Sequence, residues 1–230
     1  HADTYAPAHY GPQSWSSGVL ITNDHFGTHI DAPCHQAHHM QLLGGVPVAP
    51  EVETQTGFTQ LGAETIPPLV GRGALLDVAA HLKRDPLLDE YPITRKDLSG
   101  CAEAQGVALS PGDVALVRTG AGKLWNDPAR YAQAGGLAPD ASRWLGEKDV
   151  RAVGADNLFV DAVGVRDEAT GAMAFAHLHL LSERGIYLVE NLNLEALAAD
   201  RLYHFVFVGL PLKLKGATGS PIRPIAIRAG

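Results

Sequence analysis

Four short runs along the chain alternate between hydrophobic and polar positions, and glycine and proline bound them. They are Gly73–Val78, Asp113–Arg118, Ile186–Glu190 and Leu202–Leu210. A period of two puts successive side chains on opposite faces of an extended backbone, so these runs predict β-strands.

Three other segments have the pattern of helices. Thr94 precedes Ser99–Gln105, and Asp97 follows Thr94 three residues later, as in a capping box. Pro139–Leu145 places its apolar residues on one helical face, and Leu194–Ala199 predicts a short helix after a strand. Strands interspersed with helices predict a mixed α/β class with a sizeable sheet.

Composition limits the kind of protein. With 230 residues, 46% of them hydrophobic, the chain has enough apolar material for one core, and we expect a single domain over residues 1–230. A net charge of −7 argues against a nucleic-acid partner, and the longest apolar stretches are too short for a membrane helix of about 20 residues. We expect a cytoplasmic protein that acts on a small molecule, although the printed sequence begins at His1 and so leaves a signal peptide open.

The histidines are unevenly distributed. Five of the 11 fall within fifteen residues, namely His25, His29, His35, His38 and His39. A period of two places His25, Gly27, His29 and Asp31 on one face of a predicted strand and Phe26, Thr28 and Ile30 on the other. After Pro33, the spacing of His35, His38 and His39 predicts one face of a helical turn.

Neutral imidazoles beside a carboxylate form the kind of site that borderline divalent cations prefer. The string therefore predicts a metal site that includes His25, His29, Asp31 and His35. The alternative is a solvated strand face of ordinary polar residues. Cys34 has the opposite parity to His29 and Asp31, and we interpret it as a small buried hydrophobe.

A second group lies far downstream. His177 and His179 precede the predicted strand Ile186–Glu190, in which Glu190 shares a face with Ile186 and Leu188. A carboxylate in such apolar surroundings must find a cation or hydrogen-bond donors, so Glu190 is a candidate metal ligand. The alternative is a salt bridge with an arginine.

These residues carry a resemblance to a known family. The string His25-x-Gly27-Thr28-His29-x-Asp31-Ala32-Pro33-x-His35 resembles the HxGTHxDxPxH motif of the cyclase family, which includes bacterial kynurenine formamidase, isatin hydrolase and some dienelactone hydrolases. Further landmarks match in order, and the resemblance covers nearly the whole chain. They are Val117–Gly120, Val153–Asp156, His177–Glu190 and Gly219–Ala226.

The resemblance implies a swivelling β/β/α fold, a homodimer or homotetramer, and Mn²⁺ or Zn²⁺ as cofactor. In this family the positions that match His29, Asp31 and His35 hold metal, and Asp31 bridges if two ions are bound. A downstream histidine and Glu190 then complete a second site. The family's HxxLL pattern selects His177, whereas counting back from Glu190 falls between His177 and His179.

The resemblance also implies a histidine just after the motif that transfers protons, and we favour His39 over His38. The expected reaction is attack of metal-activated water on an amide-type carbonyl, as in an isatin-like lactam or an aryl formamide such as N-formylkynurenine. Alternatives are a lactone hydrolase, a non-catalytic metal-binding domain, and an Fe(II) and O₂ enzyme that uses His29, Asp31 and His177.

Four aromatic residues are candidates for the wall of a substrate pocket: Trp15, Phe26, Trp125 and Phe159. Because only 7% of the chain is aromatic, we expect each of them to belong to the core instead.

Overall fold

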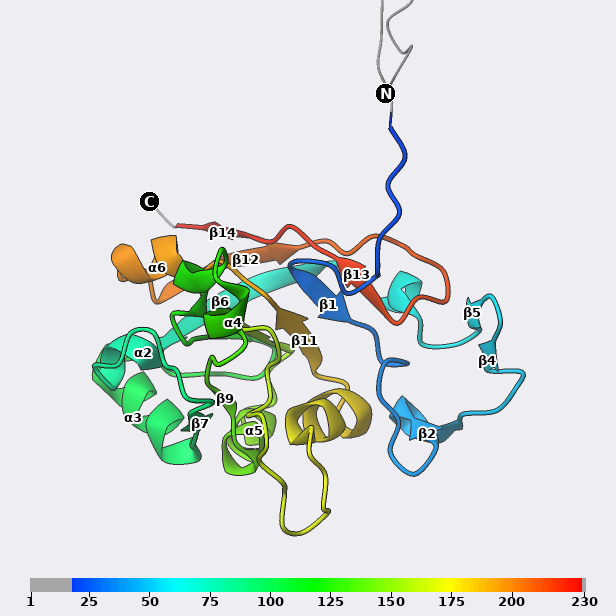
Figure 1. Cartoon of the computed structure of the whole chain (residues 1–230), viewed down its shortest axis with the longest axis horizontal. Helices are drawn as coiled ribbons and strands as arrows, with labels where there is room; N and C mark the ends of the chain where they lie inside the picture. The colour runs from blue at the N-terminus through cyan, green and yellow to red at the C-terminus, as the bar shows by residue number, and fades with distance from the viewer. Residues whose placement is uncertain (1–17, 229–230) are drawn as a thin grey trace, which may run out of the picture.

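The computed structural model describes residues 18–228, and an eight-stranded sheet runs through this part of the chain (Figure 1). In spatial order its strands are β13 (Gly219–Pro221), β1 (His29–Asp31), β11 (Tyr187–Glu190), β10 (Ala152–Ala155), β8 (Val114–Arg118), β6 (Leu69–Asp77), β12 (His204–Gly209) and β14 (Ile225–Ile227). The four central strands, from β11 to β6, are parallel to one another. The two strands on each side pair antiparallel.

Helices lie mainly on one side of this sheet, where Figure 1 shows α2, α3 and α5 below the strands. The helices are α2 (Val78–His81), α3 (Arg95–Gln105), α4 (Pro128–Tyr131), α5 (Pro139–Glu147), a π-helix (His177–Glu183) and α6 (Glu195–Ala199). Short 3₁₀ turns occur at Leu43–Gly45, Ala63–Thr65 and Ala121–Leu124. Three two-stranded ladders complete the described chain: β2 (Gln41–Leu42) with β3 (Val46–Pro47), β4 (Glu53–Thr54) with β5 (Gly57–Phe58), and β7 (Pro92–Ile93) with β9 (Gly136–Leu137).

The sheet separates two apolar clusters, and strand β8 shows why. Ala115 and Val117 face the cluster beneath the helices, whereas Val114 and Leu116 face the cluster formed with the loops after β1 and the C-terminal strands. Both faces are buried, as is usual for parallel strands, so a central strand reads as a nearly continuous apolar run.

The predicted mixed α/β class is confirmed, and so are the four strands from the alternating runs, as β6, β8, β11 and β12. The capping box is also confirmed, because Thr94 and Asp97 each accept a hydrogen bond from the other's backbone at the start of α3. The helices predicted at Pro139–Leu145 and Leu194–Ala199 correspond to α5 and α6. Cys34 is buried, as expected.

Two local predictions are wrong. The strand expected over residues 25–31 is only His29–Asp31, because Gly27 adopts a left-handed backbone conformation with φ of 62° and turns the chain before β1. Phe26 consequently lies on the surface rather than on a buried face.

The helical turn expected over His35, His38 and His39 is absent from the described chain. His38 pairs instead with Gln41 across a tight turn in which His39 and Met40 have positive φ. Two consecutive left-handed residues make a hairpin turn, not a helix. In residues 18–228, no helix is both long and apolar enough to cross a membrane.

Candidate metal centre

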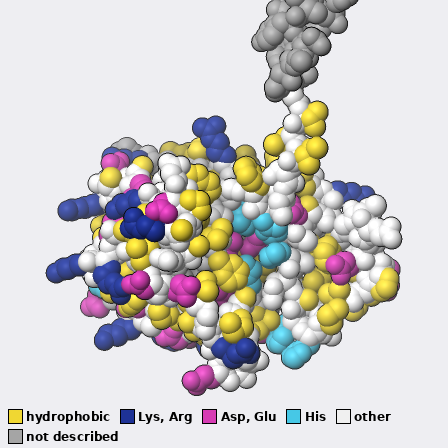
Figure 2. All heavy atoms as spheres, in the orientation of Figure 1, with side chains coloured by type: hydrophobic (Ala, Val, Ile, Leu, Met, Phe, Trp, Pro, Cys, Tyr) yellow, Lys and Arg dark blue, Asp and Glu magenta, His cyan; other side chains and the backbone are white. Residues whose placement is uncertain are grey.

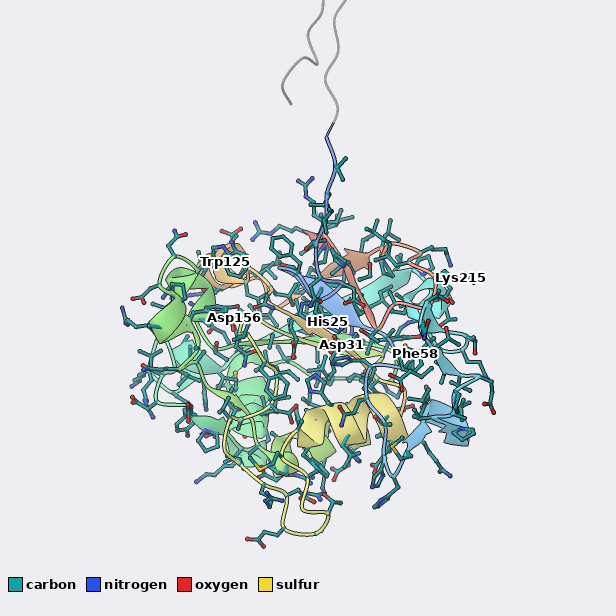
Figure 3. The ribbon with its side chains drawn as sticks, turned by 45° about the vertical axis from the view of Figure 1, so that its right-hand side comes forward. His25, Asp31, Phe58, Trp125, Asp156 and Lys215 are labelled. Carbon is teal, nitrogen blue, oxygen red and sulfur yellow. The ribbon has the colours of Figure 1, made fainter. Side chains whose placement is uncertain are left out.

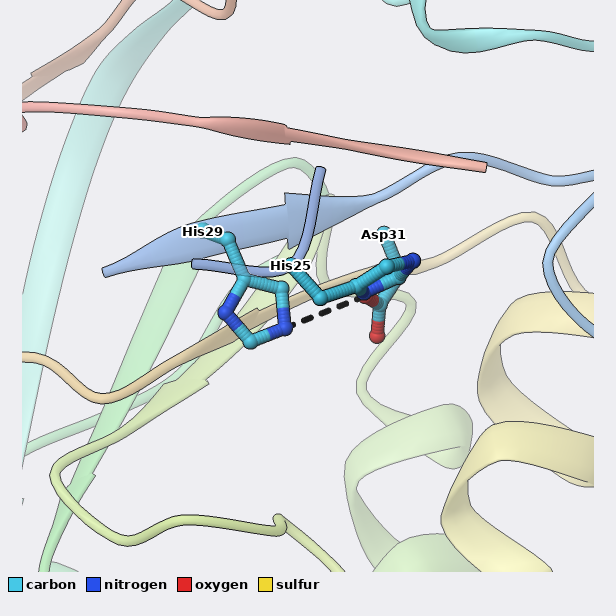
Figure 4. A group of neighbouring side chains, drawn as sticks. All are labelled: His25, His29 and Asp31. Atoms are coloured by element: carbon cyan, nitrogen blue, oxygen red, sulfur yellow. Dashed lines mark ion pairs between the residues drawn. The ribbon is translucent and has the colours of Figure 1, made fainter. Parts of the chain in front are cut away.

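Strand β1 carries the centre of the site. His29 and Asp31 are two residues apart, so their side chains leave the strand on the same face (Figure 4). His29 Nε2 lies 3.5 Å from Asp31 Oδ1, and His25 Nδ1 lies 3.0 Å from the same oxygen. Ligand atoms of these three residues all fall within 4.8 Å of one another.

The turn at Gly27 folds His25 back over the strand. The neighbouring strand β13 leaves room for its ring at Gly219, where an added Cβ would lie 2.8 Å from His25 Cε1. Contacts below 3.0 Å force a shift, so the glycine at this landmark has a steric reason.

The second oxygen of Asp31 faces a different set of residues. His177 Nε2 from the π-helix lies 3.4 Å from Asp31 Oδ2. The ring of His35 lies 4.3 Å from that of His25 and 5.7 Å from that of His177, between centroids. Asp31, His35 and His177 form a second group whose ligand atoms lie within 4.8 Å of one another. Asp31 is therefore common to both groups.

Glu190 closes the site from strand β11, where it is the register partner of His29. Its carboxylate lies 3.4 Å from His29 Nε2 and 3.7 Å from His177 Nε2, and it accepts a hydrogen bond from Val160 N. Within the described residues no arginine pairs with Glu190, so the salt-bridge alternative is wrong.

Outer contacts orient the imidazole rings. The carbonyl of Gly27 accepts a hydrogen bond from His29 Nδ1, which leaves the Nε2 lone pair directed at the site. The hydroxyl of Thr218 donates its one proton to Asp24, so its oxygen accepts a hydrogen bond from His25 Nε2. The Nδ1 lone pair of His25 then faces Asp31.

His177 is held in the same way, because its Nδ1 lies 2.6 Å from Asp161 Oδ2. The pairing of a carboxylate with an imidazole behind the ligand atom is typical of metal sites. Sequence reasoning missed Asp161 and Thr218, since a lone aspartate or threonine carries no spacing signal.

The donor set fits a cation. Both oxygens of Asp31 are fully buried and accept no hydrogen bond from the described residues. Buried carboxylates normally have partners, so a cation is the missing one. Ligand atoms about 2.1 Å from a common ion lie ~3.0–3.4 Å apart in octahedral or tetrahedral geometry, close to the separations around Asp31.

The pKa shifts of the site residues also favour a bound cation. Burial opposes ionisation of Asp31, but contacts with His177 and His25 hold its pKa well below the ordinary value. Burial also acts to lower the pKa of His177, yet the hydrogen bond to Asp161 and the carboxylates of Asp31 and Glu190 outweigh it and raise this pKa to about 10. The pocket thus strongly attracts positive charge, which a proton or a metal ion supplies.

His35 behaves differently from His177. Desolvation, aided by the neighbouring imidazoles, lowers the pKa of His35 to about 4 against the attraction of Asp31. Its ring is therefore neutral at physiological pH, which is the form that coordinates metal.

Three of the candidate histidines from the sequence lie outside this cluster. His179 Nδ1 bonds Glu183 and its ring stacks on Phe175, so of the two downstream candidates only His177 joins the cluster. His38 Nδ1 lies 3.3 Å from Glu183, and the ring of His39 stacks on His38. In the described chain, no hydrogen bond or ion pair links His38 or His39 to the six predicted ligands.

A cavity of about 380 Å³ opens beside His25. Phe26, Trp125 and Leu158 form its apolar wall, and the first two are more than half exposed, so the expectation that they are core residues is wrong. Phe159 is partly exposed and stacks on His177, and Trp15 lies outside the described residues. Figure 2 shows histidine and acidic side chains meeting in the middle of the face, bordered by hydrophobic ones.

Comparison with known proteins shows which family this chain belongs to. The model of the Cyclase family, described as putative cyclase, matches residues 3–162. The chain belongs to the cyclase family. It is 27% identical to a kynurenine formamidase of Bacillus cereus over 209 residues, which is 90% of this chain and 78% of that protein.

Solved structures of cyclase-family proteins have the same fold. A crystal structure titled as a novel cyclase superposes with a TM-score of 0.84 at 31% identity, covering 99% of this chain and 77% of that one. Isatin hydrolase A from Labrenzia aggregata, bound to benzyl benzoate, gives a TM-score of 0.69 at 26% identity, covering 96% and 79%. The fold class implied by the sequence resemblance is therefore confirmed.

Proposed function

We propose that this cyclase-family protein is a metal-dependent hydrolase that opens an amide-type carbonyl, either in an isatin-like lactam or in an aryl formamide such as N-formylkynurenine. The observation that carries the proposal is the buried carboxylate of Asp31, whose two oxygens face imidazole nitrogens and accept no hydrogen bond from the described residues. Similarity to a kynurenine formamidase and an isatin hydrolase supports the choice of carbonyl.

We assign the metal ligands to two groups that share Asp31. His25, His29 and Asp31 would hold one ion, and Asp31, His35 and His177 a second. Glu190 approaches both groups from β11, through His29 and His177. Mn²⁺ and Zn²⁺ both suit imidazole and carboxylate ligands. Once bound, such an ion lowers the pKa of water towards neutrality and polarises a carbonyl oxygen.

The chain's own residues supply orientation and proton transfer. Asp161, Thr218 and the Gly27 carbonyl hold the rings so that their free nitrogens converge. We propose that His39, or His38, carries the proton from water to the leaving group, as the family resemblance implies. Loss of such a group costs typically ~10²–10⁴-fold in rate.

A matched pair of variants on the π-helix tests the metal assignment. His177→Asn should lose bound metal and activity, whereas His179→Asn should keep both, because only the first ring enters the cluster. Metal is counted by elemental analysis after loading with Mn²⁺ or Zn²⁺. Equal metal content in the two variants would remove His177 from the site.

The reaction is tested with a panel of a lactam, an aryl formamide and a lactone. Chelation should abolish hydrolysis of the preferred class, and added Mn²⁺ or Zn²⁺ should restore it; turnover indifferent to chelation would contradict the proposal. Preference for the lactone would favour the lactone hydrolase, and oxygen consumption would favour the Fe(II) alternative. His39→Ala and His38→Ala should keep metal while losing rate.

We also propose a homodimer or homotetramer, on the family resemblance alone. Light scattering of the purified protein tests this directly.

A further inference from the structure

Two neighbouring cavities lie beside the metal centre and share part of their lining. The larger, of about 380 Å³, includes His25 in its lining, and the smaller, of about 200 Å³, lies next to it along Thr28 and Gly122. Trp125 and Asn191 line both cavities. In Figure 3, His25 and Asp31 lie close together at the middle of the fold, with Trp125 further off at one side.

The backbone of Asn191 is fixed from two directions. Its amide donates to the carbonyl of Asn157, and its carbonyl accepts from the hydroxyl of Thr28 at 2.6 Å. Asn191 has φ of 56°, a left-handed conformation that asparagine and glycine tolerate better than other residues. This residue directly follows Glu190, so its position relative to the cluster is set by the end of β11.

The side chain of Asn191 is oriented as well. The hydroxyl of Tyr131, itself buried, donates to Asn191 Oδ1 at 2.7 Å, and the carbonyl of Asp156 is a second, longer acceptor at 3.1 Å. Burial raises the pKa of Tyr131 above its ordinary value, so the hydroxyl keeps that proton. Oδ1 of Asn191 therefore accepts a hydrogen bond from the protein. Its amide Nδ2 is a free donor, because no described residue accepts a hydrogen bond from it. A donor held in one orientation at a cavity wall is preorganised to bind an acceptor.

The walls of the two cavities have few charged groups. Apart from His25, their side chains are apolar or uncharged, and no described lysine or arginine lines either cavity. The apolar surface of Phe26, Trp125 and Leu158 suits a flat ring. An acceptor on that ring would be recognised by a neutral donor rather than by a cation.

We propose that Asn191 is a specificity residue that donates from Nδ2 to a second carbonyl of an aromatic amide substrate, beside the carbonyl that is hydrolysed. Tyr131 acts through Asn191 and is a positioning residue. The inference rests on the proposed function, because it places the hydrolysed carbonyl at the metal centre.

Binding to metal-free protein tests the inference without turnover. Isatin and oxindole are matched lactams, and only isatin has the second carbonyl. The variant Asn191→Gly removes the amide and retains the left-handed backbone at little cost. Calorimetry should show isatin affinity about 2- to 12-fold weaker in Asn191→Gly, the size of one neutral hydrogen bond, with oxindole affinity unchanged.

Kinetics supply a second readout in the metal-loaded protein. For 2-acetylformanilide, Asn191→Gly should raise KM with kcat nearly unchanged, whereas formanilide, which lacks the second carbonyl, should respond little. Tyr131→Phe should also raise this KM, but by less. In the Asn191→Gly background the same substitution should have no effect, because Tyr131 then has no side chain to orient. Additive effects would instead indicate a general structural role for Tyr131.

The outcomes separate this inference from the proposed function. Equal losses of affinity for isatin and oxindole, or none for either, would overturn the role of Asn191 even if the protein hydrolyses amides. A selective loss for isatin in a protein without amide hydrolysis would uphold the recognition and reject the reaction.

Discussion

The buried charges around Arg118 and those around Asp31 lie on strands of the same sheet but differ in how completely they are paired. Arg118 is 2% exposed, and its guanidinium nitrogens donate to Asp77, Asp85 and Glu195. Lys123 adds a further ion pair to Asp85 at 2.7 Å. Each charged nitrogen of Arg118 thus has a partner within the protein.

Asp31 is equally buried, yet neither of its oxygens accepts a hydrogen bond from a described residue. The imidazole rings around it direct their second nitrogens at the same space, because their other nitrogens are engaged by Gly27, Thr218 and Asp161. Complete pairing indicates a group that holds the fold together, and incomplete pairing of a buried charge indicates a group that binds a ligand.

The largest effect is expected at Asp31. Asp31→Asn should lose the metal and about 10⁴-fold or more in kcat/KM, equivalent to ~5.5 kcal/mol of transition-state stabilisation. The control Asp167→Asn removes a buried carboxylate that Arg143 and Thr170 satisfy, and it should keep the metal.

Arg118→Met should destabilise the fold and leave metal binding intact. Removing Arg118 leaves the buried carboxylate of Asp77 without its ion-pair partner and costs about 3–5 kcal/mol in the free energy of unfolding. Metal content and activity per folded molecule should stay close to those of the unsubstituted protein. Chemical denaturation and elemental analysis measure the two effects, and loss of metal from the folded variant would erase the distinction between the two groups.

Asp161→Asn is expected to have an intermediate effect. The substitution weakens the contact that orients His177 and so should reduce metal affinity by about 10- to 100-fold without abolishing binding. Competition with a chelator measures the affinity. An unchanged affinity would show that the ring of His177 needs no orienting partner.

The smallest effect is expected at Gly219. In Gly219→Ala the new methyl group would displace the ring of His25, and we expect a loss of metal affinity of about tenfold or less. Gly71→Ala is the control on strand β6, where the nearest atom to an added Cβ is 3.8 Å away. If both variants bind metal alike, His25 is not constrained by β13.

Sequence reasoning identified the members of the site better than the path of the chain. His29 and Asp31 share a face because β1 is a strand, as the period of two predicted. His25 shares that space for a different reason, since Gly27 turns the chain back and a pattern of alternation cannot distinguish a turn from a strand. The choice of His177 over His179 likewise needed the π-helix, whose period differs from that of an α-helix.

Long-range strand pairings explain why the sequence did not predict strand β10 or the contact of Thr218 with His25. Strand β10 is short and contains Gly154, so its alternation is weak, although it lies between β8 and β11 at the centre of the sheet. Thr218 reaches His25 across 193 positions of sequence through the pairing of β1 with β13. Such contacts depend on strand order, which local patterns do not encode.

Anomalous scattering from a crystal of the protein grown with Mn²⁺ would show whether Asp31 binds a metal ion. We predict a peak about 2.0–2.3 Å from Asp31 Oδ1 and His29 Nε2, with a second peak on the Oδ2 side near His177 if two ions bind. A fully loaded crystal with no peak at Asp31, or with Asp31 hydrogen-bonded to protein or water alone, would contradict the assignment of this cluster as the metal centre.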